Sequence, residues 1–222
     1  MEHTDKYYEQ ELKGLKEVIL KMGGLVEEMI TLSLKSLTER DTDPGEAIDQ
    51  REREVNSLEI DIDDRCLQML ALRQPTASDL RFITIGLKIG KDLERIGDLA
   101  INIYEQAQEL NHEPPLKPYI DLPLLATKTQ AMVKKALDAF VNQEAGHAQE
   151  VCAMDDEADD LNQKIFQDLV GLMQKNPEAV SRGTRLITCA KHLERMADHA
   201  TNIAEQVIFM VQGRDIRHGR SL

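Results

Sequence analysis

Apolar residues in the first part of the chain recur at alternating steps of four and three positions. This spacing places them on one stripe of an α-helix, since a helical turn takes about 3.6 residues. The pattern fades in a polar segment that contains Pro44 and Gly45, two residues typical of turns. A long helix is therefore predicted near residues 5–40, with an apolar stripe of Tyr8, Leu12, Leu15, Ile19, Met22, Val26 and Met29.

Two more helical patterns follow, near residues 45–73 and 76–111. They are separated at Pro75, because a proline disfavours helical geometry at the residue that precedes it. Helical periodicity then stops between residues 111 and 123, where Pro114, Pro115, Pro118 and Pro123 predict a linker. Three further helices are predicted near residues 122–143, 146–174 and 178–212. The tail, residues 213–222, has no apolar period, and we expect it to be flexible.

The two groups of three helices repeat each other. Asp92–Ile103 reads DLERIGDLAINI, and His192–Ile203, 100 positions later, reads HLERMADHATNI. A second match joins Glu52–Leu58 to Asp155–Leu161 at a displacement of 103 positions. Two matches in the same order and at nearly equal displacement indicate a duplicated unit. The sequence thus predicts an all-α fold of two tandem three-helix bundles, with domains at residues 1–113 and 121–212.

Composition narrows the class of protein. Aromatic residues make up only 4% of the 222 residues and Trp is absent, which disfavours β-sandwiches and barrels. The formal net charge of −13 repels nucleic acid and anionic lipid, so neither is expected as a direct partner. No apolar run approaches the roughly 20 residues that span a bilayer. The three cysteines lie far apart, and the N-terminal residues lack a signal-peptide pattern, so we expect a cytoplasmic protein.

The third helix of each half carries carboxylates on its core-facing row. Glu94 and Asp98 are one turn apart, as are Glu194 and Asp198 in the second half. Partly buried carboxylates repel each other unless they take up protons, form ion pairs or bind a cation. The second helices add Glu52 with Asn56 and Asp155 with Asp159 at the same spacing, so carboxylates from two helices could form a cation site. His199 could add a nitrogen ligand.

Two other interpretations of these stripes remain open. Lys91, Arg95, Lys191 and Arg195 lie close enough in sequence to neutralise the glutamates, which would make the helices a structural scaffold. A carboxylate-bridged di-metal oxidase or hydrolase is the enzymatic alternative. The sequence shows no nucleophile with a partnered base and no Glu-x-x-His motif in mid-helix, which argues against an enzyme.

The chain resembles the PhoU family of bacterial phosphate signalling. The resemblance is carried by Leu70–Arg81, which reads LALRQPTASDLR, together with Asp92–Asp98, Asp155–Asp159 and His192–Asp198, and it extends over nearly the whole chain. It implies two three-helix bundles and metal clusters of iron or zinc-like ions on E(D)xxxD motifs. In this sequence those motifs supply the ligands Glu94, Asp98, Asp155, Asp159, Glu194 and Asp198, and Glu52 is the remaining counterpart.

The resemblance also implies a function and partners. It predicts a cytoplasmic, homodimeric, non-enzymatic regulator that links the ATPase subunit of a phosphate ABC transporter to a membrane sensor histidine kinase. Such a protein restrains the phosphate-starvation response. Because Asn56 replaces a carboxylate, we expect the cluster of the first half to bind metal more weakly than that of the second.

Overall fold

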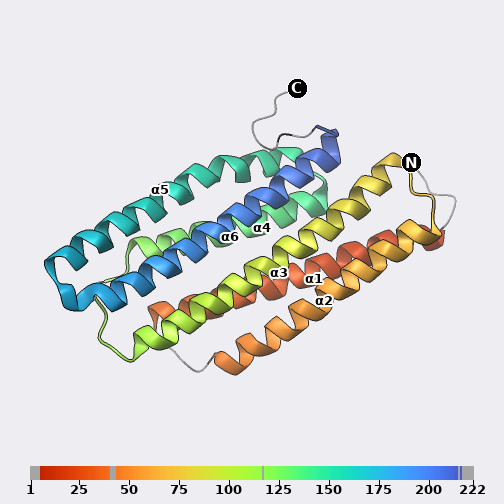
Figure 1. Ribbon diagram of the computed structural model, residues 1–222. Helices are drawn as coiled ribbons and strands as arrows, with labels where there is room; N and C mark the ends of the chain where they lie inside the picture. The colour runs from red at the N-terminus through yellow and green to blue at the C-terminus, as the bar shows by residue number, and fades with distance from the viewer. Residues whose placement is uncertain (1–5, 41–43, 117, 215, 217–222) are drawn as a thin grey trace.

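The described residues form six long α-helices (Figure 1). The computed structural model describes residues 6–40, 44–116, 118–214 and 216. The first half contains α1 (Lys6–Thr38), α2 (Gly45–Leu72) and α3 (Ala77–Asn111). The second contains α4 (Asp121–Asn142), α5 (Ala145–Lys175) and α6 (Val180–Gln212), with the short 3₁₀ helix η1 (Pro177–Ala179) before α6. Every α-helix begins and ends within two residues of its predicted bounds. Most of the tail predicted to be flexible lies outside the described residues.

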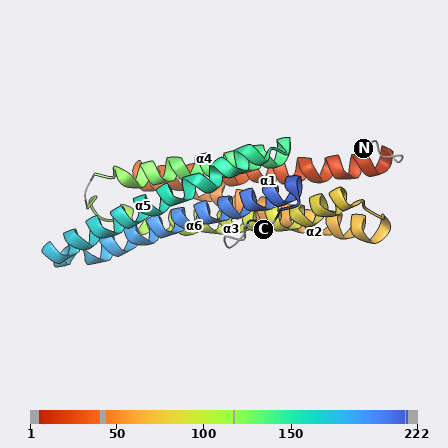
Figure 2. The same ribbon diagram turned by 90° about the horizontal axis from the view of Figure 1, so that it is seen from above.

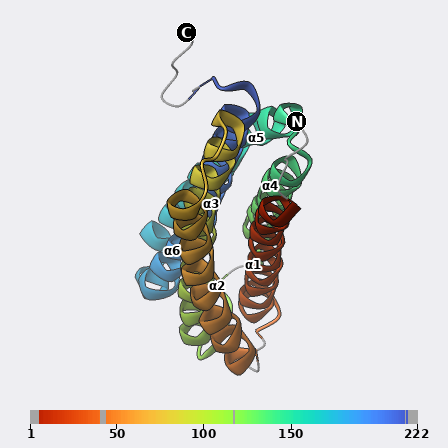
Figure 3. The same ribbon diagram turned by 90° about the vertical axis from the view of Figure 1, so that its right-hand side faces the viewer.

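The helices pack as two groups of three. Within each half all three helices contact one another, and the halves meet through α3 with α6 and through α1 with α4. Figure 2 shows α1 and α4 along one side of the molecule, with α3 and α6 along the other. In the end-on view of Figure 3, α2 packs beside α3, away from α4. The predicted all-α fold of two duplicated three-helix bundles is confirmed.

The buried apolar side chains of both halves form one continuous cluster. The stripe predicted for α1 is buried at six of its seven positions, and the seventh, Leu12, packs against the cluster. Phe82 of α3 stacks on Phe140 of α4 with ring centroids 5.4 Å apart, so aromatic packing joins the two halves. The core therefore extends across the boundary between the repeats.

Small residues bring the second and third helices of each half close together beside the carboxylates. A Cβ atom added at Gly90 of α3 would lie 3.3 Å from Cγ2 of Ile62 on α2, which is tighter than usual packing. The equivalent residue of α6 is the buried Ala190. Gly90 and Ala190 precede Glu94 and Glu194 by one helical turn, so each glutamate lies where two helices approach closely.

Candidate metal centre

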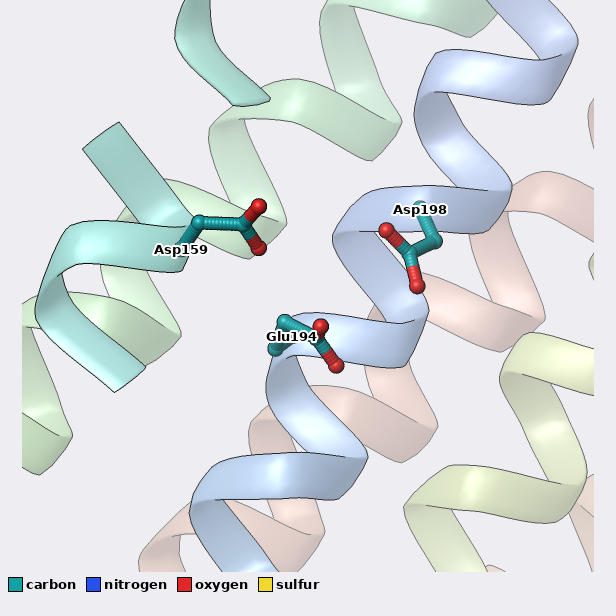
Figure 4. A group of neighbouring side chains, drawn as sticks. All are labelled: Asp159, Glu194 and Asp198. Atoms are coloured by element: carbon teal, nitrogen blue, oxygen red, sulfur yellow. The ribbon is translucent and has the colours of Figure 1, made fainter. Parts of the chain in front are cut away.

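Three carboxylates of the second half converge in the seam between α5 and α6. Asp159 reaches across from α5, and Glu194 and Asp198 lie one turn apart on α6 (Figure 4). One oxygen of each side chain lies within 4.8 Å of the corresponding oxygens of the other two. Within the described part of the chain, no other three Asp, Glu, His or Cys side chains come together this closely.

The seam leaves this cluster half open to solvent. Glu194 is buried, with 9% of its surface exposed, whereas Asp159 and Asp198 are exposed. The ammonium group of Lys191 donates a hydrogen bond to Glu194 from 2.6 Å. Glu194 thus lies at the buried end of the site, and the two aspartates lie at its exposed end, where an ion from solvent can reach them.

The acids of the cluster repel one another, and Lys191 offsets this repulsion only in part. Partial desolvation of the carboxyl group in the seam, followed by the charges of Glu194, Asp155 and Asp159, raises the pKa of Asp198 to about 6. Burial and the charges of Asp155 and Glu194 raise the pKa of Asp159 as well, although Lys191 opposes this shift. Both aspartates therefore ionise less readily than in water, and a cation among them would relieve the repulsion.

Asp155 belongs to the surroundings of the cluster. Its Oδ1 accepts a hydrogen bond of 3.0 Å from the hydroxyl group of Thr201 on α6. Its charge raises the pKa of Asp159 and of Asp198. The structure therefore places Asp155 one turn along the same seam, outside the tight group of three.

His199 has a different partner from the one considered for it in the sequence. Its Nδ1 atom lies 2.9 Å from Oδ1 of Asp92 on α3, and Gln206 donates to the other oxygen of Asp92 from 3.0 Å. Within the described residues, His199 is not part of the tight carboxylate group. The reason is geometric: consecutive residues of a helix point about 100° apart, so Asp198 faces α5 while His199 faces α3.

The first half pairs its carboxylates with cations. Lys91 Nζ lies 3.2 Å from Glu94, and Arg95 contacts both Glu94, at 3.5 Å, and Asp98, at 3.0 Å. Glu94 and Asp98 thus share a seam with two basic side chains, as the scaffold interpretation supposes for both halves. That interpretation describes the first half well. In the second half, Lys191 forms an ion pair with Glu194, but the pKa values of Asp159 and Asp198 are still raised. The scaffold interpretation therefore describes the second half less well.

Glu59 is the carboxylate of α2 that joins the ion pairs around Glu94, and it was not among the residues predicted from the sequence. Glu59 lies 3.4 Å from Lys91 and so joins the ion pairs of Glu94. Burial and the charge of Glu59 raise the pKa of Asp63. Among the described residues, Glu52 belongs to no close group of three acids. Glu59 and Asp63 have the same one-turn spacing as the predicted pairs, but Glu52 is the residue that lies at the position matching Asp155 of the second half.

Oxygen donors dominate the second-half cluster. Three carboxylates suit hard cations such as Mg²⁺, Mn²⁺, Ca²⁺ or ferric iron, whereas zinc sites usually include nitrogen or sulfur ligands. The donor set therefore fits a divalent or trivalent metal ion and fits iron better than zinc. Asp159, Glu194 and Asp198 are the residues that would hold such an ion.

Comparison with known proteins agrees with the duplicated architecture. The family model described as "PhoU domain" matches twice, at residues 19–107 and 122–207. The chain belongs to the PhoU family. The two matched segments correspond to the two halves of the structure, so the predicted family and the predicted duplication are both confirmed.

Several PhoU relatives match along most of their length. A Pseudomonas aeruginosa protein named "Phosphate-specific transport system accessory protein PhoU homolog" is 36% identical over 97% of this chain and 90% of its own. "PhoU homolog 2" of Thermotoga maritima is 34% identical over 92% of this chain and 87% of its own.

Solved PhoU structures share the fold. The crystal structure of PhoU from Pseudomonas aeruginosa matches with a TM-score of 0.90 and 36% identity, over 93% of this chain and all of that one. The phosphate transport system regulatory protein PhoU from Streptococcus pneumoniae matches with a TM-score of 0.86 and 27% identity, over 94% of this chain and 98% of that one. In the described residues, no helix is both long and apolar enough to cross a membrane.

Proposed function

We propose that this PhoU protein is a cytoplasmic, metal-binding regulator of phosphate uptake. The observation that carries the proposal is the match of both halves to the PhoU domain, together with relatives named as accessory proteins of the phosphate-specific transport system. The protein acts as an adaptor between the ATPase subunit of a phosphate ABC transporter and a membrane sensor histidine kinase. Through that link it restrains the phosphate-starvation response, and it acts as a homodimer.

The proposed metal site lies at the α5–α6 seam. Asp159, Glu194 and Asp198 bind a divalent or trivalent ion, with Asp155 adding negative charge from one turn away. Glu52, Glu94 and Asp98 form at most a weaker site in the first half, because Lys91 and Arg95 already offset the charges of Glu94 and Asp98. An ion held by Asp159, Glu194 and Asp198 would link α5 to α6 at this seam.

A binding role fits the second-half cluster better than catalysis does. The relatives carry accessory or regulatory names. Di-iron enzymes on helical bundles use Glu-x-x-His motifs at mid-helix, whereas the tight group here consists of three carboxylates. Assays for phosphoester hydrolysis and for ferrous iron oxidation by oxygen test this point, and turnover that depends on Glu194 would contradict a non-enzymatic role.

The regulatory role is tested in cells whose only copy of the gene carries a defined change. A reporter for a phosphate-starvation gene is measured in ample phosphate, with protein abundance checked. We expect Glu194→Ala/Asp198→Ala to leave the reporter on in ample phosphate. The matched control is Glu94→Ala/Asp98→Ala, which should relieve repression less. Normal repression by the second-half variant at normal abundance would show that the cluster is dispensable for regulation.

A further inference from the structure

The second-half cluster already contains a cation that belongs to the protein. Lys191 Nζ lies 2.6 Å from both Oε1 and Oε2 of Glu194, one turn along the same helix. The Lys191 side chain is 55% exposed, whereas that of Glu194 is 11% exposed. The ammonium group therefore occupies the carboxylate of Glu194, and its flexible, half-exposed stem allows it to leave without disturbing the core.

The equivalent lysine of the first half is held by more partners. Lys91 contacts Glu94 at 3.2 Å and also Glu59 of α2 at 3.4 Å, so it bridges two helices. Beside it, Arg95 spans Glu94 and Asp98. Two cations thus neutralise most of the charge of three carboxylates in this seam.

The second half lacks these additional contacts. Asn162 occupies the position that matches Glu59 at the displacement of 103 residues, so α5 offers Lys191 no second carboxylate there. Among the described residues, no ion pair joins Arg195 to Asp198. One exposed ammonium group therefore faces three carboxylates, which leaves the larger net negative charge in the second half.

We propose that Lys191 is an exchangeable internal counter-ion, which a metal ion displaces from Glu194 when it binds. Lys91 and Arg95 are the corresponding cations of the first half, and they are not displaced. They stay paired with Glu94 and Asp98 at metal concentrations that occupy the second-half site. This inference rests on the proposed metal binding. Its physical basis is competition, because a metal ion can bind Glu194 only if it replaces the ammonium group of Lys191. A lysine paired with one carboxylate is easier to displace than two cations that each contact two carboxylates.

Titration with Mn²⁺ by calorimetry tests the competition, since Mn²⁺ prefers oxygen ligands. Lys191→Met keeps the apolar stem and removes the charge, so it should tighten Mn²⁺ binding by roughly tenfold. It should also enlarge the rise in Tm that Mn²⁺ causes. Lys191→Arg keeps the charge and should not tighten Mn²⁺ binding. Lys91→Met should change neither the affinity nor the stoichiometry, because Arg95 still spans Glu94 and Asp98.

Labelling of lysine amines, read by mass spectrometry, gives a second measurement. Saturating Mn²⁺ should increase the labelling of Lys191 as it leaves Glu194, and should leave the labelling of Lys91 unchanged. Wild-type binding that Lys191→Met does not tighten would overturn this inference alone. Failure of both the wild type and Lys191→Met to bind Mn²⁺ would overturn the metal centre and the inference together. A second binding event in Lys91→Met would overturn the assigned role of Arg95.

Discussion

One residue that differs between the repeats changes the number of carboxylates in the two seams. Asp159 of α5 corresponds to Asn56 of α2 at the displacement of 103 residues. The additional carboxylate helps to raise the pKa of Asp198, and it completes the tight group of three. An amide at this position carries no charge to repel a neighbour or to attract a metal ion. One residue therefore accounts for the third carboxylate of the second-half group and for its absence at the matching position of the first half.

Glu27 provides a test of burial that is independent of the metal centre. This half-buried carboxylate of α1 has a raised pKa, caused first by burial and also by Asp138 of α4, which outweigh the attraction of Lys134. The folded state thus prefers the protonated form, and the stability that this preference contributes is lost as the pH rises through the raised pKa.

Glu27→Gln should therefore stabilise the protein at pH 8, by less than about 1 kcal/mol, and should have little effect at pH 4. Urea denaturation at the two pH values measures the difference in the free energy of unfolding. Glu17→Gln on the same helix is the control, because Glu17 is exposed and pairs only loosely with Lys13, at 3.7 Å. A gain from Glu27→Gln that is equal at both pH values would contradict the explanation by burial.

At the scale of elements, α1 and α4 meet closely at one glycine. A Cβ atom at Gly23 of α1 would lie 2.5 Å from Cδ1 of Leu137 on α4, whereas one at the adjacent Gly24 would meet nothing within 4 Å. Both glycines lie within the same helix, so they share the same cost in helix propensity. Their difference isolates the packing between the two helices.

Gly24→Ala should raise the free energy of unfolding by about 0.5–1 kcal/mol, because alanine loses less backbone entropy on folding. Gly23→Ala should gain less than this, since the Leu137 side chain must move to make room. Chemical denaturation of the two variants measures both effects. Equal gains would show that α1 and α4 are not closely packed at this point.

For the molecule as a whole, the halves are joined by more than the linker. The apolar core is continuous across α3, α6, α1 and α4. Arg40, after α1, donates to the carbonyl oxygen of Asn111 from 2.7 Å, and Arg182 of α6 donates to that of Pro114 from 2.8 Å. Arginines from both halves therefore hold the segment that connects them.

The whole chain should consequently unfold in one cooperative transition. Circular dichroism and calorimetry should give coincident midpoints, and the calorimetric and van't Hoff enthalpies should agree. A chain ending at residue 113 should be much less stable, because it would expose the faces of α1 and α3 that the second half covers. Two separate transitions in the full chain would show that the halves fold independently.

The sequence by itself determined the helices and their duplication. Apolar residues at helical spacing must lie on one face to be buried together, so the stripe from Tyr8 to Met29 was sufficient to predict α1. Pro44, Pro75, Pro114, Pro115 and Pro118 marked the breaks because proline disrupts the interior of a helix, whereas Pro123 lies in the first turn of α4, where proline is tolerated. The one-turn spacing of Glu194 and Asp198 also placed them on one face of α6 before any packing was known.

Only the tertiary structure decided which carboxylates meet. Glu52 and Glu59 are seven residues apart, about two turns, so both lie on nearly the same face of α2. The axial offset between α2 and α3 brings Glu59 to Lys91, and that offset follows from apolar contacts far apart in sequence, such as Gly90 with Ile62. The same holds for Asp159, whose approach to Glu194 and Asp198 depends on the packing of α5 against α6. Local spacing specifies a helix face, but the axial position of one helix against another is set by the core that they share.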